Sequence, residues 1–259
     1  MIDLHCHLLP GLDDGPATLE EALDLARGMV AAGTHTAIAT PHIDDTWNVA
    51  PAEIAGRVAV VQSALDEAEI SLQVLPGGEV TLARLTQLSR DDAWAVRLGG
   101  GPYLLLECPL TPAAGDFHLF VAKLHKREPH IVLAHPERSP LFQRDHERLR
   151  ELVAGGVVTS VTAEAFTGRF GSAVRDFAFE LLREDLVHTI ASDAHDRRRR
   201  PPGMVAGLRA AAEEESWVLA RADWYTRAMP EAIVEGRPLP PPPAAAIPAP
   251  RVRRRLWDG

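Results

Sequence analysis

The sequence predicts an α/β fold in one domain, a distorted (β/α)7 barrel of the TIM type. Short β-branched runs alternate with longer helical patterns along the chain. Seven such strand–helix repeats fit within about 230 residues, which favours a closed barrel over an open, doubly wound sheet. No Gly-x-Gly-x-x-Gly motif follows a strand and no Walker loop occurs, which weakens the nucleotide-binding alternatives.

The first half of the chain carries three strand–helix pairs with clear local signals. The first helix begins at a capping box of Thr18 and Glu21 and ends at Gly33. The second has apolar residues near positions 54, 58, 61 and 65, the spacing of one helical face. The expected elements are strands 2–4, 36–40 and 71–75 and helices 18–32, 51–68 and 81–88.

The second half continues the alternation and closes on two helices. The strands are short aliphatic runs, typical of a buried parallel sheet. The expected strands are 103–106, 131–134, 157–161 and 187–191. The expected helices are 116–127, 145–154, 172–183, 203–214 and 216–228.

The chain end has a different composition. Residues 238–250 contain seven prolines, and four arginines follow between Arg251 and Arg255. Such a segment cannot pack a core. Residues 1–236 are therefore expected to form the domain and residues 237–259 an extended or disordered tail, with docking to a partner as the alternative.

Composition narrows the class of protein. The 36 acidic and 27 basic residues leave a net charge of −9, which disfavours nucleic-acid binding and suits carboxylates that hold cations. The two cysteines, Cys6 and Cys108, form no disulfide framework. With no signal peptide and no apolar run of about 20 residues, we expect a cytoplasmic protein without membrane insertion. Assembly into an oligomer stays open.

Metal-ligand side chains follow the predicted strands at their carboxyl ends. In a parallel barrel these ends open onto one face, where the loops build the active site. Nine such ligands would suffice for two or three divalent cations. They are His5, His7, Asp14, His42, Glu79, Glu107, His135, Asp193 and His195.

The spacing of these residues supports the interpretation. His5 and His7 lie two apart on a strand, so both point to one side while Cys6 points into the core. A single strand-end histidine is more often structural than metal-binding, and only the whole set argues otherwise. Asp14 lies in the turn-forming Gly-Leu-Asp-Asp-Gly-Pro stretch, so spacing alone leaves it equally a turn former.

Five separated motifs then match a known family in order. They are MIDLHCHLLPGLDDGP at 1–16, ATPH at 39–42, GGEV at 77–80, AHPER at 134–138 and ASDAH at 191–195. The sequence resembles the PHP (polymerase and histidinol phosphatase) superfamily. More narrowly, it is similar to the bacterial tyrosine-protein phosphatases of capsular and exopolysaccharide operons, the CpsB/YwqE type. The resemblance runs from Met1 to about Gly236.

The resemblance implies a PHP-type (β/α)7 barrel holding three divalent metal ions. It implies manganese first, with iron, zinc or magnesium as alternatives, and the nine residues above as ligands. It also implies that Arg138 and Arg200 bind the substrate phosphate. For the arginine run that contains Arg200, the alternative is a solvated charged stretch. His42 and His195 are the candidates for assisting proton transfer.

The expected activity is phosphomonoester hydrolysis, in which a metal-activated hydroxide attacks phosphorus. The favoured substrate is the phosphotyrosine of a bacterial tyrosine kinase in exopolysaccharide biosynthesis. A histidinol-phosphatase-like enzyme and a non-enzymatic metal-binding, kinase-docking module remain alternatives. The sequence has no Cys-x5-Arg loop, which excludes the cysteine-nucleophile phosphatases.

Two features bear on the choice of substrate. Asp44 and Asp45 follow His42 where family members often carry a basic residue, and two acids there would repel a phosphate dianion. They leave the substrate preference open. Neither Lys123 nor Lys126 stands at a strand end, which disfavours an amidohydrolase site built on a carboxylated lysine.

Overall fold

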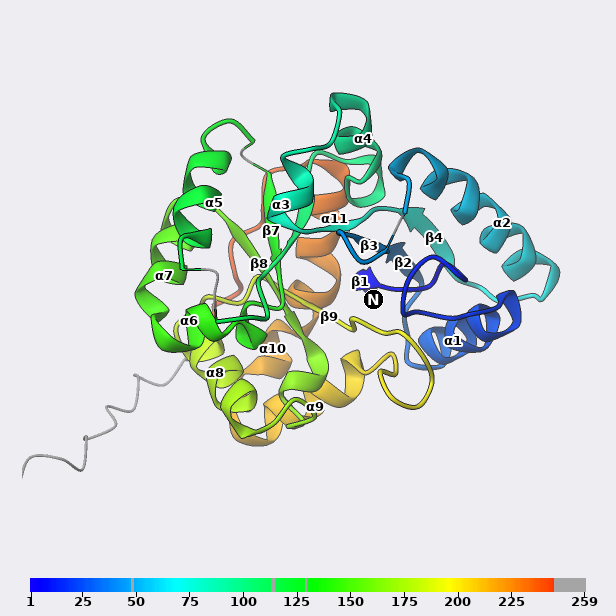
Figure 1. The fold of residues 1–259 in the computed structure, drawn as a ribbon. Helices are drawn as coiled ribbons and strands as arrows, with labels where there is room; N and C mark the ends of the chain where they lie inside the picture. Colours follow the sequence, from blue (N-terminus) through cyan, green and yellow to red (C-terminus); the bar gives the residue numbers. More distant parts are fainter. Residues whose placement is uncertain (48, 113–114, 129, 245–259) are drawn as a thin grey trace, which may run out of the picture.

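The computed structural model describes residues 1–47, 49–112, 115–128 and 130–244. Parallel strands occupy the middle of the molecule, with α1 and α2 on one side and α5, α7 and α8 on the other (Figure 1). Among the described residues every strand pairing is parallel. The prediction of an α/β fold with parallel strands is therefore confirmed.

The strands form two sheets whose order follows the sequence. One sheet contains β1 (Ile2–Cys6), β2 (Thr36–Ala39) and β4 (Gln73–Pro76). The other contains β3 (His42–Ile43), β5 (Glu79–Val80), β6 (Leu104–Glu107), β7 (Ile131–Ala134), β8 (Val158–Thr162) and β9 (Thr189–Ala191). All seven expected strands are present, with ends that differ by up to two residues. The strands β3 and β5 are additional, and at two residues each they are too short to leave a pattern in the sequence.

The first strand and the segment after the last strand lie side by side. Cys6 pairs with Ala194 in an isolated parallel bridge. His7 N–H donates to the Ala194 carbonyl and Asp193 N–H donates to the His5 carbonyl, each at 2.8 Å. These bonds bring the His-x-His segment next to the Asp-x-His segment, although the two are far apart in sequence.

Helices follow most strands on the outside of the sheets. They are α1 (Leu19–Ala31), α2 (Ile54–Glu67), α3 (Leu82–Leu85), α4 (Arg90–Ala95), α5 (Phe117–His125), α6 (Pro140–Arg144), α7 (His146–Ala154), α8 (Ser172–Arg183), α9 (Met204–Glu214), α10 (Val218–Asp223) and α11 (Met229–Glu235). The capping box at α1 is confirmed, because the Thr18 hydroxyl accepts from Glu21 N–H and the Glu21 carboxylate accepts from Thr18 N–H. Gly33, with a φ of +85°, follows the end of this helix.

The end of the domain differs from the prediction. The expected helix 216–228 is wrong in its C-terminal boundary, because helical structure continues to Glu235. A π-helical stretch, Trp224–Ala228, connects α10 to α11, and Pro230 stands at the start of α11. Proline lacks an N–H, and a wider π turn accommodates the missing hydrogen bond. The short helices α4 and α6 were also not predicted.

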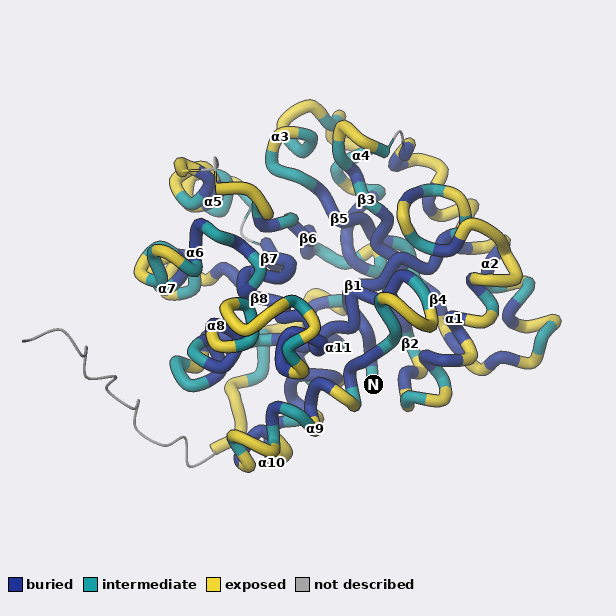
Figure 2. The backbone as a smooth tube through the Cα atoms, turned by 60° about the horizontal axis from the view of Figure 1, so that its bottom comes forward, coloured by how far each residue is buried: buried dark blue, intermediate teal, exposed yellow. Residues whose placement is uncertain are grey.

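Burial follows the layers of the fold. The strands are buried in the middle of the molecule, and the exposed residues lie on the outer helices and loops (Figure 2). Cys6 is fully buried and its thiol donates to the Ile38 carbonyl at 3.4 Å, so its predicted place in the core is confirmed. Among the described residues, no helix is both long and apolar enough to span a bilayer.

The first residues of the expected tail lie against the domain. Residues 237–244 form no helix or strand. Arg221 donates to the Pro243 carbonyl at 3.1 Å, and the Trp224 indole donates to the Pro240 carbonyl at 3.0 Å. This part is therefore extended and held by side chains. The rest of the predicted tail, 245–259, lies outside the described residues.

His188 gives the fold a pH dependence. Its Nδ1 accepts from Thr159 N–H at 3.2 Å, which requires the neutral ring, and burial lowers the pKa of His188 to about 4. The unfolded chain, with a pKa near 6.5, binds the proton more readily. The contribution to stability is thus complete above pH 6.5 and lost as the pH falls toward 4.

We expect His188→Asn, which keeps an acceptor but cannot be protonated, to remove this dependence. Between pH 7 and pH 5 the wild type should lose about 2 kcal/mol of stability relative to the variant. Urea unfolding of both proteins at the two pH values measures this difference. Equal losses in the two proteins would show that His188 does not titrate as described.

Candidate metal centre

The nine predicted ligands converge at the carboxyl ends of the strands. Eight of them form three clusters in which one ligand atom per residue lies within 4.8 Å of the others. The ninth, His135, places Nε2 2.7 Å from Glu79 Oε1. The clusters are His7, Asp14, His42 and His195; His5, His7 and Asp193; and His42, Glu79 and Glu107.

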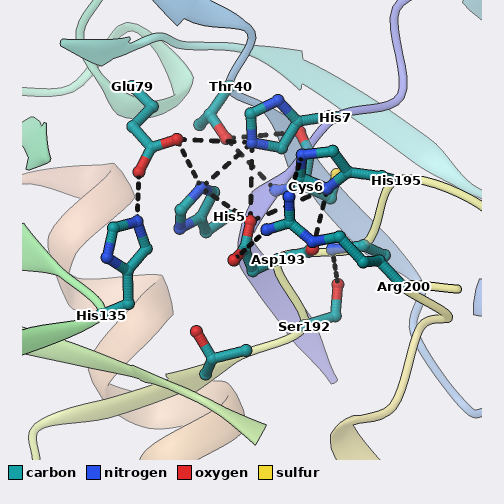
Figure 3. Close-up of polar contacts among 12 residues, drawn as sticks. His5, Cys6, His7, Thr40, Glu79, His135, Ser192, Asp193, His195 and Arg200 are labelled. Atoms are coloured by element: carbon teal, nitrogen blue, oxygen red, sulfur yellow. Dashed lines mark hydrogen bonds and ion pairs between the residues drawn. The ribbon is translucent and has the colours of Figure 1, made fainter. Parts of the chain in front are cut away.

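At the middle of the centre, two imidazoles and two carboxylates face one another (Figure 3). His5 Nε2 lies 3.3 Å from His7 Nε2 and 3.2 Å from Glu79 Oε2. Asp193 Oδ1 lies 3.4 Å from His5 Nε2 and 3.6 Å from His7 Nε2. Four atoms arranged tetrahedrally about 2.1 Å from an ion lie about 3.4 Å apart. The spacing therefore fits a bound divalent ion.

Unpaired polar atoms support this fit. Glu79 Oε2, Asp193 Oδ1 and His42 Nδ1 are buried and have no hydrogen-bond partner among the described residues. A buried carboxylate oxygen without a donor is costly, because nothing replaces the water it has lost. A cation at this position would satisfy these lone pairs, and the mixture of oxygen and nitrogen donors suits a divalent transition metal.

Asp14 and His195 extend the centre toward solvent. Asp14 Oδ1 lies 3.1 Å from His195 Nε2 and 3.5 Å from His42 Nε2. The Asp14 side chain therefore faces the site, whatever part it also takes in the turn. The His195 ring stacks on the His7 ring with centroids 3.8 Å apart. Burial lowers the pKa of His195 to about 4, which leaves it neutral and able to bind a metal.

Glu107 lies at the other end of the centre. Its carboxylate joins His42 and Glu79 in the third cluster. Burial and the neighbouring Glu79 raise the pKa of Glu107 to about 8. Two carboxylates so close repel each other unless a proton or a cation lies between them.

Two of the predicted ligands have an unusual backbone conformation. His135 has a φ of +37° and Asp193 a φ of +51°, a left-handed conformation uncommon outside glycine. His135 directly follows β7, and Asp193 lies two residues after the end of β9. Such strained positions concentrate at functional sites.

Both predicted phosphate-binding arginines reach the centre. Arg138 Nη1 donates to Asp193 Oδ2 at 2.7 Å, and its guanidinium lies 4.7 Å from the Phe170 ring centroid. Arg200 donates to the same oxygen of Asp193 and to His195 Nε2, the latter at 2.7 Å. Both side chains are partly exposed, 17% and 25%, so they can meet an anion that enters the site.

Sequence reasoning missed two buried carboxylates behind the ligands. Asp13 accepts from His7 Nδ1 at 2.6 Å and from His42 N–H at 3.0 Å. Asp3 accepts from Ser192 N–H at 3.0 Å and thereby connects β1 to the segment after β9. The sequence gives one signal for Asp13, which is that it stands next to the predicted ligand Asp14.

The remaining predicted residues have other surroundings. Asp44 Oδ1 accepts from Thr46 N–H and Trp47 N–H, each at 2.8 Å, so part of its charge is offset within its own loop, and Asp45 is exposed. The six other histidines contribute no atom to the three clusters of described residues. Lys123 lies inside α5 and Lys126 just after it, away from a strand end, as expected.

We expect Asp13→Asn to weaken metal binding. The Asp13 carboxylate receives the Nδ1 proton of His7 and so directs the Nε2 lone pair into the centre. Loss of such a carboxylate lowers metal affinity about 10- to 100-fold. Competition of each protein with a fluorescent chelator for Mn²⁺ measures the change. Asp91→Asn, on the exposed face of α4, is the matched control, and equal affinities in the two variants would contradict the role of Asp13.

Comparison with known proteins places the chain in a family. The family profile described as capsular polysaccharide synthesis, CpsB/CapC, matches residues 1–216. The tyrosine-protein phosphatase YwqE of Bacillus subtilis is 31% identical over 203 residues, which cover 77% of this chain and 79% of that protein. The tyrosine-protein phosphatase CpsB of Streptococcus pneumoniae is 29% identical over 212 residues, covering 79% and 86%.

Solved structures agree with this placement. One from the work on YwqE of Bacillus subtilis and CpsB of Streptococcus pneumoniae, described as metal-dependent tyrosine phosphatases, aligns with a TM-score of 0.83 and 27% identity. The alignment covers 98% of this chain and 100% of that chain. A histidinol phosphate phosphatase from Lactococcus lactis, at 13% identity and a TM-score of 0.56, covers 82% of this chain and 92% of its own and shares the fold alone. The chain belongs to the CpsB/CapC family of capsular polysaccharide synthesis proteins.

Proposed function

We propose that this protein is a metal-dependent phosphatase that hydrolyses phosphotyrosine in a protein substrate. The observation that carries the proposal is the meeting of His5, His7, Glu79 and Asp193 at metal-ligand spacing beside two arginines. Relatives that align over most of the chain are named as tyrosine-protein phosphatases. A tyrosine kinase of capsular or exopolysaccharide synthesis is the substrate we propose.

The nine converging residues are the proposed ligands of three divalent ions, Mn²⁺ first and Fe, Zn or Mg as alternatives. The three clusters support that number. His7 belongs to two of them but offers one lone pair, because its Nδ1 donates to Asp13, so it would bind in only one. When bound, such ions neutralise phosphate charge and lower the pKa of the water that attacks phosphorus. The buried lone pairs of Glu79 and Asp193 support their assignment as ligands.

Arg138 and Arg200 are the proposed phosphate-binding residues. Both guanidinium groups approach Asp193 Oδ2 from the open side of the centre. A planar guanidinium can donate two parallel hydrogen bonds to the non-bridging oxygens of a phosphate. Negative charge moves toward the leaving group as the phosphoryl group is transferred. The fixed positive charges of the two arginines would stabilise this transition state.

Hydrolysis of a tyrosine phosphate requires little proton donation to the leaving group. A tyrosine phenolate leaves with a pKa of about 10, far below that of an alkyl alcohol, and so requires little acid catalysis. His42 directs both ring nitrogens toward the centre, with Nε2 3.5 Å from Asp14 and Nδ1 3.2 Å from Glu79. A nitrogen that holds a metal cannot donate a proton. Any such assistance would therefore come from a ring nitrogen of His42 or His195 that holds no ion.

We further propose that residues 1–236 form one distorted (β/α)7 barrel with a C-terminal tail. The chain passes from β2 directly into β3 and from β4 directly into β5, which connects the first sheet to the second. The bridge between Cys6 and Ala194 places the first strand beside the segment that follows the last. The ligands at the strand ends would then share one face of the barrel.

A panel of substrates tests the proposed function. Purified protein with Mn²⁺ is assayed on a phosphotyrosine peptide, the matched phosphoserine peptide and histidinol phosphate. We expect the highest kcat/KM on the phosphotyrosine peptide, because its leaving group is the best of the three. A clear preference for histidinol phosphate would instead assign the protein to small-molecule phosphatases, and the absence of any hydrolysis would favour a docking module.

A further inference from the structure

Two arginines beside the candidate centre have no role in the proposed chemistry. The loop 196–200 carries four arginines, of which Arg200 contacts Asp193 and Arg197 pairs with Asp24 at 3.4 Å. Arg198 and Arg199 are exposed, and within the described part of the chain neither side chain forms an ion pair. Their charges are therefore free to meet an anion from outside.

The loop holds these two arginines on a defined backbone. Asp196 Oδ1 accepts from Arg198 N–H and Arg199 N–H, each at 2.6 Å. The Arg199 carbonyl accepts from Arg169 at 2.7 Å. The Arg200 carbonyl accepts from His195 N–H at 2.8 Å, which closes the loop onto the centre. Both side chains thus start from fixed positions, which lowers the entropy lost on binding a ligand.

A glycine in α1 allows the loop to approach closely. Gly28 lies inside the helix, where glycine costs about 1 kcal/mol relative to alanine. A Cβ at this position would lie 2.7 Å from Arg197 Cδ, closer than real contacts allow. Arg197 therefore lies directly on α1, where it also donates to the Asp24 carbonyl at 3.1 Å. Gly28 thus leaves room for the Arg197 side chain against the helix.

Between α1 and the loop is a hollow of about 560 Å³ that opens from the centre. Asp14 and His195 of the centre line it together with Arg197, Arg198 and Arg199. The volume is comparable to that of ligand sites, which span roughly 300–1,000 Å³. An extended substrate whose phosphate lies at the centre can therefore place a neighbouring side chain here.

The carboxylates that line the hollow are already engaged. Asp24 faces Arg197, and Asp14 faces His195 and Arg200. Glu21 accepts from Ala17 N–H and Thr18 N–H in the α1 cap, and Asp196 accepts from its own loop. Among the charged residues that line the hollow, Arg198 and Arg199 are therefore the described side chains without a polar partner, and they are the groups that could meet an anionic ligand.

We propose that Arg198 and Arg199 form a subsite for a second anionic group on the substrate. The group is a carboxylate or a phosphate on a residue near the phosphotyrosine, both of which a guanidinium binds through paired hydrogen bonds. The inference rests on the proposed function, because it assumes that a phosphotyrosine lies at the centre. It adds a preference for acidic or multiply phosphorylated sequences.

Three phosphotyrosine peptides of equal length test the subsite. One has neutral neighbours, one has glutamates and one carries a second phosphotyrosine. Wild-type kcat/KM should be about fivefold higher on the two acidic peptides, the effect of two exposed ion pairs. The double variant Arg198→Ala/Arg199→Ala should lose this preference and hydrolyse p-nitrophenyl phosphate at the wild-type rate. The double lysine variant should retain part of the preference.

The double variant Arg57→Ala/Arg209→Ala, at exposed arginines on α2 and α9, controls for the loss of two positive charges. A preference for only the doubly phosphorylated peptide assigns the subsite to phosphate, and a preference for both assigns it to anions in general. Equal rates on all three peptides in the wild type overturn the subsite and leave the phosphatase intact. An equal loss on p-nitrophenyl phosphate in the alanine variant also overturns it. No hydrolysis of any phosphotyrosine substrate overturns the proposed function as well.

Discussion

Replacement of Glu79 by glutamine is expected to lower kcat roughly a thousandfold or more and to remove bound metal. Glu79 Oε2 lies 3.2 Å from His5 Nε2, 3.4 Å from His7 Nε2 and 3.2 Å from His42 Nδ1. Its Oε1 lies 2.7 Å from His135. Glutamine keeps the shape but removes the negative charge and places an N–H₂ donor where lone pairs converge. Metal analysis by mass spectrometry, together with kcat on p-nitrophenyl phosphate, measures both effects.

Glu137→Gln is the matched control for this change. Glu137 is also fully buried, but its atoms belong to none of the three clusters of described residues. Burial raises the pKa of Glu137 to about 7, so near neutral pH much of it already carries a proton. We expect metal content to stay at the wild-type value. Full metal content and full activity in Glu79→Gln would exclude Glu79 as a ligand.

The Arg200→Ala variant is expected to lower kcat/KM by roughly 100- to 1,000-fold, the usual cost of losing one group that stabilises transition-state charge. Arg200 contacts Asp193 and His195, and its side chain is partly exposed, so an entering phosphate can reach it. Arg200→Lys keeps the charge but not the planar fork, so it should recover only part of the loss. The assay is kcat/KM on the phosphotyrosine peptide, together with inhibition by inorganic phosphate.

Metal content separates a loss of substrate binding from a damaged centre. Arg200 is not a proposed ligand, so the alanine variant should bind as much metal as the wild type. Arg209→Ala serves as the surface control. An Arg200→Ala enzyme with unchanged kcat/KM and unchanged inhibition by phosphate would show that Arg200 does not hold the phosphoryl group.

Much of the centre was predictable because strand ends are easy to find. His5 lies near the end of a strand that begins Ile-Asp-Leu, and His135 directly follows the aliphatic strand Ile131–Ala134. Parallel strands bring their carboxyl ends to the same side. The period of two in a strand placed His5 and His7 on one side and Cys6 in the core. For this reason the sequence alone led to residues that the structure brings together.

Other features depend on contacts that no local pattern encodes. The strands at His42 and Glu79 are two residues long, and only their pairing with each other and with β6 defines them. Asp13 and Asp14 are adjacent acids with different surroundings, one behind His7 and the other facing His195. The helical end of the domain continues beyond residue 228 through the π-helical stretch that precedes Pro230, although proline usually breaks a helix.

Removal and return of metal test the central claim most directly. The protein is stripped with a chelator, dialysed and assayed on a phosphotyrosine peptide, then titrated with Mn²⁺ while bound metal is counted. We expect hydrolysis to disappear with the metal and to return as the sites fill, since a bound divalent ion would lower the pKa of the attacking water. Turnover that persists unchanged in the stripped protein would contradict the metal-dependent phosphatase proposed here.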